Sequence, residues 1–459
     1  MKKFLIVCAR LFMIPLLFLF MGASREVFIY KILICFGLCF TLYRGLVVDR
    51  DWFSPFTLFS SFYLCLSIYA SGVSETYLPE LSDYTMFLIL LGSLSFLFGM
   101  VFYKIFGFIR KPKVHLASRS AAVARISDYS YWYLLLIGLM PFFYSIATNG
   151  LLILKSEGLS PLEIQEMRSS ALLPIFYILT CLLNVAIITA MRKRKKSHII
   201  IVVTVALASA VITVSKMTMV MTMFFISYGV IRNHLIKSNR LKITLLVFGI
   251  LFFFVMGHFF RSHRGYDEGV FYAYEENYNV DVSAYTENVK DVFLYYMYIA
   301  SPYTNFDYVV ENTDQFTYGR RTIFPILSIT QLKRVFDLEM EKLPIRNAPF
   351  NTHTFLADFY VDFGIWGCLF LSFTLGIIVY HFYAKAMLTD DPLDTAIYLY
   401  WGYATFMMFF NNHFTSQGYP IAFYLVISAY KAVSKHSRLF LFPRPPVKEK
   451  KCAPTWGQK

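Results

Sequence analysis

The sequence predicts an all-α, polytopic integral membrane protein, with about twelve transmembrane helices and one large outer loop between the ninth and tenth. Of its 459 residues, 57% are hydrophobic and only 16% are charged, whereas soluble proteins carry about 25% charged residues. Apolar runs of span length recur along the chain without alternating polar and apolar positions, which is typical of membrane helices and not of barrel strands. The basic residues gather in short loops, as the positive-inside rule describes.

Nine apolar runs precede the large loop. They cover residues 4–22, 27–46, 52–70, a run that ends near 106, then 131–147, 172–191, 199–214, 217–230 and 243–259. The first run follows Met1-Lys2-Lys3 and lacks a clear small-residue cleavage site, so we expect an uncleaved helix. The seventh and eighth runs are separated only by Ser215 and Lys216, and one crossing could not hold both. We therefore predict a tight outer hairpin at Lys216.

Charge fixes the predicted orientation. The sixth run ends at the basic block 192–196, and the loops near 110–125 and 232–242 are also basic, so all three are expected on the cytoplasmic side. Three more runs, at 364–383, 395–410 and 420–433, precede a basic tail. The predicted division is 1–259 for helices one to nine, 260–353 for the outer loop with short interfacial helices, 354–436 for helices ten to twelve, and 437–459 for the cytoplasmic tail. Both termini are then cytoplasmic.

The outer loop differs in charge from the rest of the chain. The net charge of the whole sequence is +14, yet residues 260–352 hold nine Lys/Arg and thirteen Asp/Glu, a balance of 9 − 13 = −4. This distribution argues against a nucleic-acid partner and for a basic surface facing the cytoplasm. A connection of this length is usually functional or disordered. The many tyrosines favour the first, and we expect interfacial helices at 285–299 and 325–338.

Two residue types in the loop suit a sugar attached to a lipid phosphate. Tyrosine stacks on sugar rings, and Tyr266 and Tyr318 are substrate-binding candidates, although interface anchoring explains any one tyrosine equally well. Arginine binds phosphate with a planar fork and stays ionised. The loop carries two arginine pairs, and these candidates for binding a pyrophosphate are Arg261, Arg264, Arg320 and Arg321. Lipid contact or a surface ion pair is the alternative for each. Lys216 is expected at the same headgroup depth.

His353 is the best candidate for a titrating catalytic group, because imidazole suits general-base work near neutral pH. His263, between the first arginines, and His413, in the last outer loop, are substrate-binding candidates that rival it. Asp358 and Asp362 lie one helical turn apart, where they either orient a basic partner or mark a polar helix start.

The end of the loop resembles a known family. His353 stands eleven positions before Gly364 of a Gly-x-x-Gly helix start, a pattern similar to that of the bacterial O-antigen polymerase and ligase superfamily. That family more often has His-Asn where this chain has His353-Thr354, so His353 and Asn351 both remain as equivalents of the family position. The resemblance implies a GT-C-like fold in the bacterial inner membrane, with the large loop and the active site in the periplasm.

The resemblance further implies a glycosyltransferase that polymerises undecaprenyl-pyrophosphate-linked repeat units and releases undecaprenyl pyrophosphate. Its partners would be that lipid-linked oligosaccharide, membrane lipids, and a chain-length regulator or flippase. No metal-ligand cluster or nucleotide fingerprint occurs in the sequence, so no metal, cofactor or nucleic acid is expected. An O-antigen ligase, a lipid-linked oligosaccharide flippase or other transporter, and a non-catalytic assembly protein remain alternatives. A transporter would concentrate its polar residues within the spans, which disfavours that alternative.

Overall fold

The computed structural model describes most of the apolar chain and part of the outer segment. The described residues are 25–71, 80–107, 130–149, 173–193, 196–212, 216–232, 287–330, 332, 342–346, 350, 352–389, 391–415 and seven positions between 420 and 428. Within them the chain is helical, with no β-strand. The predicted all-α class is confirmed for this part of the protein.

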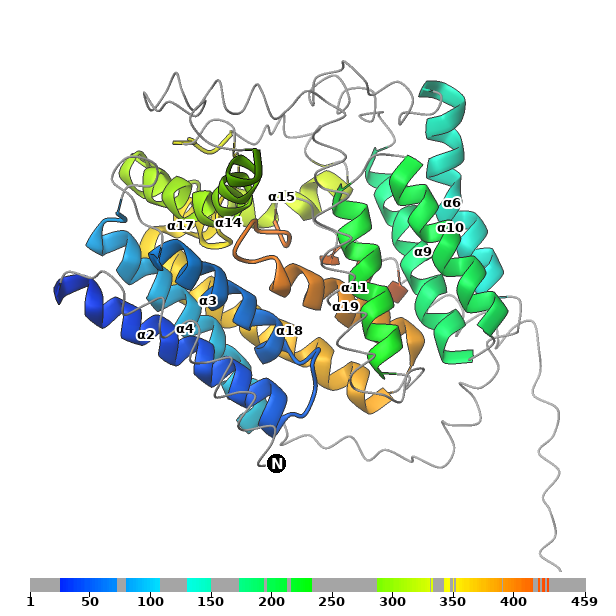
Figure 1. The fold of residues 1–459 in the computed structure, drawn as a ribbon, viewed down its shortest axis with the longest axis horizontal. Helices are drawn as coiled ribbons and strands as arrows, with labels where there is room; N and C mark the ends of the chain where they lie inside the picture. Colours follow the sequence, from blue (N-terminus) through cyan, green and yellow to red (C-terminus); the bar gives the residue numbers. More distant parts are fainter. Residues whose placement is uncertain are drawn as a thin grey trace, which may run out of the picture.

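The helices fall into two groups, and helix α19 (Pro392–Phe406) lies between them and contacts both (Figure 1). The first group contains α2 (Arg25–Leu42), η1 (Tyr43–Val48), α3 (Pro55–Ser71), α4 (Asp83–Phe106) and α18 (Ser372–Thr389). The second contains α6 (Ser130–Asn149), α9 (Leu173–Lys193), α10 (Lys196–Ile212) and α11 (Lys216–Arg232). Four elements remain: α14 (Glu287–Glu311), α15 (Arg320–Ile329), α17 (Leu356–Trp366) and η4 (Gly367–Leu371).

Three helical stretches among the described residues are long and apolar enough to cross a membrane. They are Ile29–Val48, Asp83–Phe106 and Leu356–Thr389. Shorter apolar helices accompany them, including Pro55–Ala70 and Thr218–Arg232. The chain therefore reads as a membrane-embedded helical protein, and the number of twelve spans stays a prediction. The expected spans at 4–22 and 243–259 and the tail at 437–459 lie outside the described residues.

The first helical group is held together by aromatic packing and by close backbone contact. The rings of Phe59, Phe62 and Phe96 are fully buried, and Phe59 lies 5.3 Å from Phe62 and 4.5 Å from Phe96 between centroids. A Cβ added to Gly99 would lie 2.1 Å from the carbonyl oxygen of Phe373. Only glycine fits there, so α4 and α18 approach backbone to backbone, as membrane helices do at small residues.

Helix α19 is tied to the second group by hydrogen bonds inside the bundle. Asn184 of α9 donates to the hydroxyl of Tyr400 of α19 over 3.1 Å, and Thr222 of α11 donates to the side-chain oxygen of Asn184 over 3.3 Å. All three side chains are buried. Polar side chains that bond between helices in this way hold membrane bundles together.

The outer segment is more deeply packed than the sequence predicts. The helix expected at 285–299 continues to Glu311 as α14, and the side chains of Tyr303 and Phe306 in its second half are fully buried. This part of α14 packs against α3 and α17, so it belongs to the bundle and does not lie on its surface. The helix expected at 325–338 begins earlier, at Arg320, and ends at Ile329. Residues 333–341 lie outside the described part.

A kink lies at the start of the helix expected at 364–383. The helical stretch starts at Leu356, but Phe363 (φ −144°) and Gly364 (φ +59°) are not helical. The combination of φ +59° with ψ −140° at Gly364 is readily adopted only by glycine. The kink leaves the carbonyls of Val361 and Asp362 without helical partners, and the amides of Thr317 and Tyr318 donate to them over 2.9 and 3.0 Å. The segment 356–362 is therefore a separate half-helix in front of the long apolar helix.

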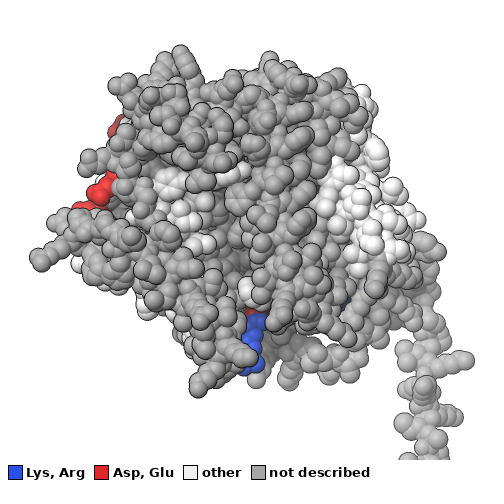
Figure 2. All heavy atoms as spheres, viewed as in Figure 1, with Lys and Arg blue, Asp and Glu red and all other residues white. Residues whose placement is uncertain are grey.

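Figure 2 shows the described charges on one face of the molecule, with acidic side chains at the upper left and basic ones at the bottom. The upper end is the one where α14, α15 and α17 lie in Figure 1. Ion pairs at the other end join the η1 turn to distant helices, as Lys104 does with Asp49 at 2.6 Å. The polar side chains of α15 and α17 therefore belong to the upper end.

Candidate functional site

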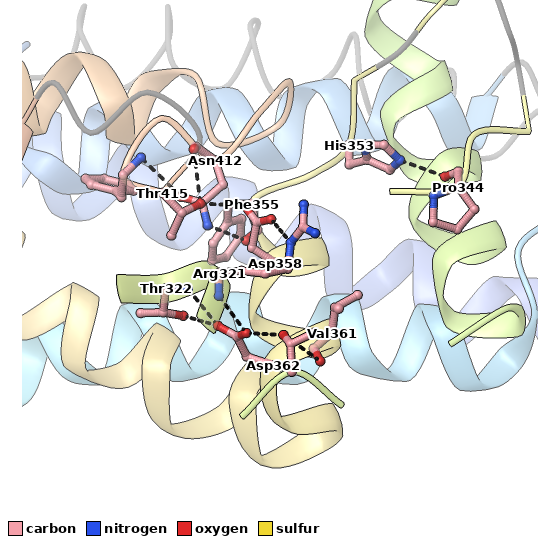
Figure 3. Close-up of polar contacts among 12 residues, drawn as sticks. Arg321, Thr322, Pro344, His353, Phe355, Asp358, Val361, Asp362, Asn412 and Thr415 are labelled. Carbon is pink, nitrogen blue, oxygen red and sulfur yellow. Dashed lines mark hydrogen bonds and ion pairs between the residues drawn. The ribbon is translucent and has the colours of Figure 1, made fainter. Parts of the chain in front are cut away.

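Asp362 of α17 caps the beginning of α15. Its side-chain oxygens accept the backbone amides of Arg321 and Thr322 over 3.0 and 2.8 Å, and the Thr322 hydroxyl over 2.6 Å (Figure 3). The first amides of a helix have no partner within the helix, and an acidic group there also meets the positive end of the helix dipole. Asp362 is fully buried. A carboxylate from a different helix thus fixes where α15 starts.

Asp358, one turn earlier on α17, binds the side chain of Arg321. The guanidinium Nε donates to Asp358 Oδ1 over 2.8 Å, and both residues are buried. The hydroxyl of Thr415 donates to the other carboxylate oxygen. Asp358 therefore orients a basic partner, Arg321, which is one of the two interpretations that the spacing of the aspartates allows, whereas Asp362 binds backbone amides of α15.

His353 lies on the segment that leads into α17, and its imidazole is buried. Its Nε2 is 2.9 Å from the carbonyl oxygen of Pro344 (Figure 3). A carbonyl oxygen only accepts hydrogen bonds, so Nε2 carries a hydrogen. In the neutral imidazole the basic lone pair is then on Nδ1. The backbone of Pro344 selects this tautomer, which is the one that a proton acceptor at Nδ1 needs.

The surroundings of His353 keep its imidazole neutral. Burial lowers the pKa of His353 from its ordinary value, and the Arg321 guanidinium lowers this pKa further. The bond to Pro344 and the Asp358 carboxylate act in the opposite direction, but the lowered pKa prevails. A histidine with a pKa below about 6.5 is unprotonated at neutral pH. His353 is thus ready to accept a proton.

Asn305 of α14 holds the segments on both sides of the histidine. Its amide nitrogen donates to the carbonyls of Phe350 and Thr352 over 2.6 and 2.9 Å, and its oxygen accepts the amide of Arg346 over 3.1 Å. One buried side chain therefore fixes the backbone next to His353 and the backbone two residues beyond Pro344. No sequence pattern singles out Asn305, which lies beyond the end of the helix expected at 285–299.

A second contact fastens the same segment. The guanidinium of Arg346 donates to Asp307 over 3.3 Å and to Glu311 over 3.4 Å. Asp307 also accepts the hydroxyl of Ser82, the residue that caps α4, over 2.8 Å. The 342–346 segment is thus attached to α14 and, through Asp307, to the beginning of α4.

The loop that follows α19, expected from the sequence on the outer side, closes on the start of α17. The amide nitrogen of Asn412 donates to the carbonyl of Phe355 over 3.1 Å, and Thr415 reaches Asp358. His413 is buried between them in the chain, with its ring 5.6 Å from that of Tyr403. The structure therefore brings this loop, which contains His413, to the Asp358–Arg321 pair.

The structure describes only some of the other candidate site residues. Arg320 is the first residue of α15 and is partly exposed, whereas Tyr318 is exposed and has an unusual φ of 49°. Lys216 begins α11, and its side chain is outside the described residues. The remaining candidates also lie outside them: Arg261, His263, Arg264, Tyr266 and Asn351. Of the proposed site, the described residues bring together His353 and Arg321.

No family model, no curated protein and no solved structure matches this chain. Within the described residues, no group of three or more His, Cys, Asp or Glu side chains is arranged to hold a metal ion. The chemical groups of the site are a neutral imidazole with a fixed tautomer and, within electrostatic range of it, a buried arginine–carboxylate pair.

Proposed function

We propose that this protein is a membrane glycosyltransferase that polymerises oligosaccharide repeat units linked to undecaprenyl pyrophosphate, at the periplasmic face of the bacterial inner membrane. The observation that carries the proposal is His353, because a buried, neutral imidazole with its lone pair on Nδ1 is equipped to take a proton from a sugar hydroxyl. The resemblance around Gly364 supplies the substrate class.

In the proposed reaction the acceptor hydroxyl oxygen attacks the anomeric carbon of the donor glycan. A new glycosidic carbon–oxygen bond forms as the bond from that carbon to the pyrophosphate oxygen breaks. The hydroxyl proton passes to Nδ1 of His353, and the electron pair of the broken bond leaves with the lipid pyrophosphate. Positive groups around the leaving group stabilise the charge that develops on it.

The arginines divide into two roles in this proposal. Arg320, Arg261 and Arg264, with Lys216, neutralise the departing pyrophosphate. Arg321 is already paired with Asp358, so we assign it to positioning, since it locks α15 onto α17 and lowers the pKa of His353. Tyr266, His263, Asn351 and His413 remain substrate-binding candidates from the sequence.

A lipopolysaccharide gel from the native host tests the proposed function. The gene is deleted and then complemented with the wild type or with a His353→Ala variant of equal membrane abundance. Loss of polymerisation alone leaves core bearing a single repeat unit, and wild-type complementation restores the ladder. Bare core in the deletion strain would overturn the proposal and favour a ligase, a flippase or an earlier step. A full ladder from His353→Ala would overturn the assignment of the base.

Replacing Asn305 with aspartate tests how the histidine segment is held. The carboxylate has the same shape but cannot donate to the carbonyls of Phe350 and Thr352. We expect the transfer rate to fall by about 10²-fold, as small misplacements of catalytic groups do. The acid limb of the rate profile should move to higher pH, because an added carboxylate raises the pKa of a nearby imidazole.

Asn312→Asp is the matched control for this variant. Asn312 follows the same helix, is exposed, and donates only to the carbonyl of Tyr308. Its replacement should leave the rate and the pH profile unchanged. Reduced abundance of Asn305→Asp with an unshifted acid limb would show that Asn305 serves the fold and not the position of His353.

A further inference from the structure

Helix α15 turns the charged side chain of Arg321 inward and leaves two isoleucines on its outward side. Its inward side carries Arg321, which is buried and bonded to Asp358, while the half-buried Thr322, bonded to Asp362, lies on the flank. Its outward side carries Ile323 and Ile326, which keep 49% and 43% of their surface exposed. A helix in water turns its apolar stripe towards the core. An apolar environment outside the chain would cover this outward side.

The exposed stripe of α15 is continuous with the outer surface of a membrane-spanning stretch. A Cβ added to Gly319, which caps α15, would lie 3.1 Å from the ring of Phe363. The next exposed rings along the chain are Trp366 and Phe370, which stack with centroids 5.7 Å apart. They are 61% and 58% exposed and belong to Leu356–Thr389, one of the stretches able to cross a membrane.

Helix α4 extends this surface along the length of the bundle. The ring of Phe98 lies 5.7 Å from that of Phe373 on α18, and the ring of Phe102 lies 5.5 Å from it. Phe98 and Phe102 are exposed on the other spanning stretch, Asp83–Phe106. Such a ridge of exposed rings on two spanning helices is the surface that lipid tails cover.

Tyr318 stands beside the outer end of the ridge. It is 80% exposed, and its backbone is anchored by the bond from its amide to the carbonyl of Asp362. Tyrosine and tryptophan are enriched where the headgroups meet the hydrocarbon core. Tyr318 next to Gly319, with Trp366 beyond the kink, fits that boundary.

We propose that Tyr318, Ile323 and Ile326 form an interfacial face that inserts into the outer leaflet of the bilayer, so that α15 lies in the plane of the membrane surface. The partner is bilayer phospholipid, argued from the continuity of this face with the exposed rings of the spanning helices. Amphipathic helices lie at membrane surfaces with their apolar side buried in this way. The inference rests on the membrane-embedded bundle and not on the proposed transfer reaction.

Insertion of α15 would set the depth of the candidate site relative to the membrane. Arg321 and Asp358 lie directly on the inner side of this helix, and His353 is within electrostatic range of both. An inserted α15 places all three groups close to the plane of the lipid headgroups. A phosphate attached to a membrane lipid lies in that same plane.

Photo-crosslinking of the full-length protein in native membranes tests the inserted face. The amino acid p-benzoylphenylalanine replaces Tyr318, Ile323 or Ile326 in separate variants, in cells whose phospholipids are radiolabelled. A fourth variant carries it at Phe370 as the lipid-facing reference, and a fifth at the exposed Asn312 as the reference facing water. After irradiation, labelled lipid bound to the protein is measured on a denaturing gel.

We expect lipid adducts at positions 318, 323 and 326 with yields similar to that at 370 and several-fold above that at 312. Yields at 323 and 326 no higher than at 312 would overturn the proposal. Adducts of twice the protein mass at these positions would overturn it in favour of a second copy of the chain. Three independent positions keep the test valid if one variant fails to accumulate, and the measurement stands whether or not the protein transfers glycans.

Discussion

Replacing His353 with alanine is expected to lower the rate of glycan transfer by about 10²- to 10⁴-fold, the usual contribution of a positioned general base. The rate is measured with purified protein and a synthetic lipid-linked repeat unit, at equal protein concentration. His381→Ala is the matched control, because His381 is an exposed histidine whose Nδ1 lies 2.9 Å from the hydroxyl of Tyr103 and which has no part in the proposed reaction. An unchanged rate in His353→Ala would contradict the assignment.

The pH dependence of the wild type follows from the lowered pKa of His353. The base must be neutral to accept a proton, so the rate holds through neutral pH and falls only as the pH drops through a value below about 6.5. Because the unfolded chain binds this proton more readily than the folded one, stability also falls as the pH drops below about 6.5. The residual rate of His353→Ala should lack this acid limb.

Replacing Asp358 with asparagine is expected to destabilise the protein by about 3–5 kcal/mol, because it leaves the buried guanidinium of Arg321 without its carboxylate. Asparagine keeps an acceptor for the hydroxyl of Thr415. The measurement is thermal unfolding in detergent micelles. Asp314→Asn, at an exposed carboxylate on the turn before α15, is the control and should unfold like the wild type.

A second substitution separates the charge from the fold. Adding Arg321→Met to Asp358→Asn removes the unpaired charge and should recover most of the lost stability, since the cost of breaking a buried ion pair comes mainly from the charge left uncompensated. The double variant should still transfer glycan slowly, because α15 loses its attachment to Asp358. A double variant as unstable as Asp358→Asn alone would mean that the cost comes from packing and not from charge.

The sequence predicts those features whose causes lie close together along the chain. The apolar helices follow from composition, and the spacing of Asp358 and Asp362 places both on one helical face. His353 stands out because no other histidine precedes such a glycine pattern. The start predicted at Gly364 marks a real boundary, but there the helix kinks, and a half-helix precedes it.

The features that escape sequence reasoning depend on contacts between distant segments. Asn305 is one polar residue among many in a segment rich in tyrosine, and nothing local shows that it reaches three backbone groups more than forty positions away. The tautomer of His353 depends on a carbonyl oxygen, a group that every residue possesses. The capping of α15 by Asp362 crosses 41 positions, so local capping patterns could not reveal it.

Because Asp362 caps α15 through an amide 41 positions earlier, α15 can be completed only after α17 has been synthesised. Helix α15 has 10 residues, and a helix shorter than about 12 residues is marginal by itself in water. Its cap and the carboxylate for Arg321 both arrive with α17, which emerges later from the ribosome. The segment from 312 to 330 therefore lacks its helix cap and its ion pair until α17 has been synthesised. A chain interrupted before residue 362 lacks the groups that complete its outer site, so a truncated product cannot assemble the site prematurely.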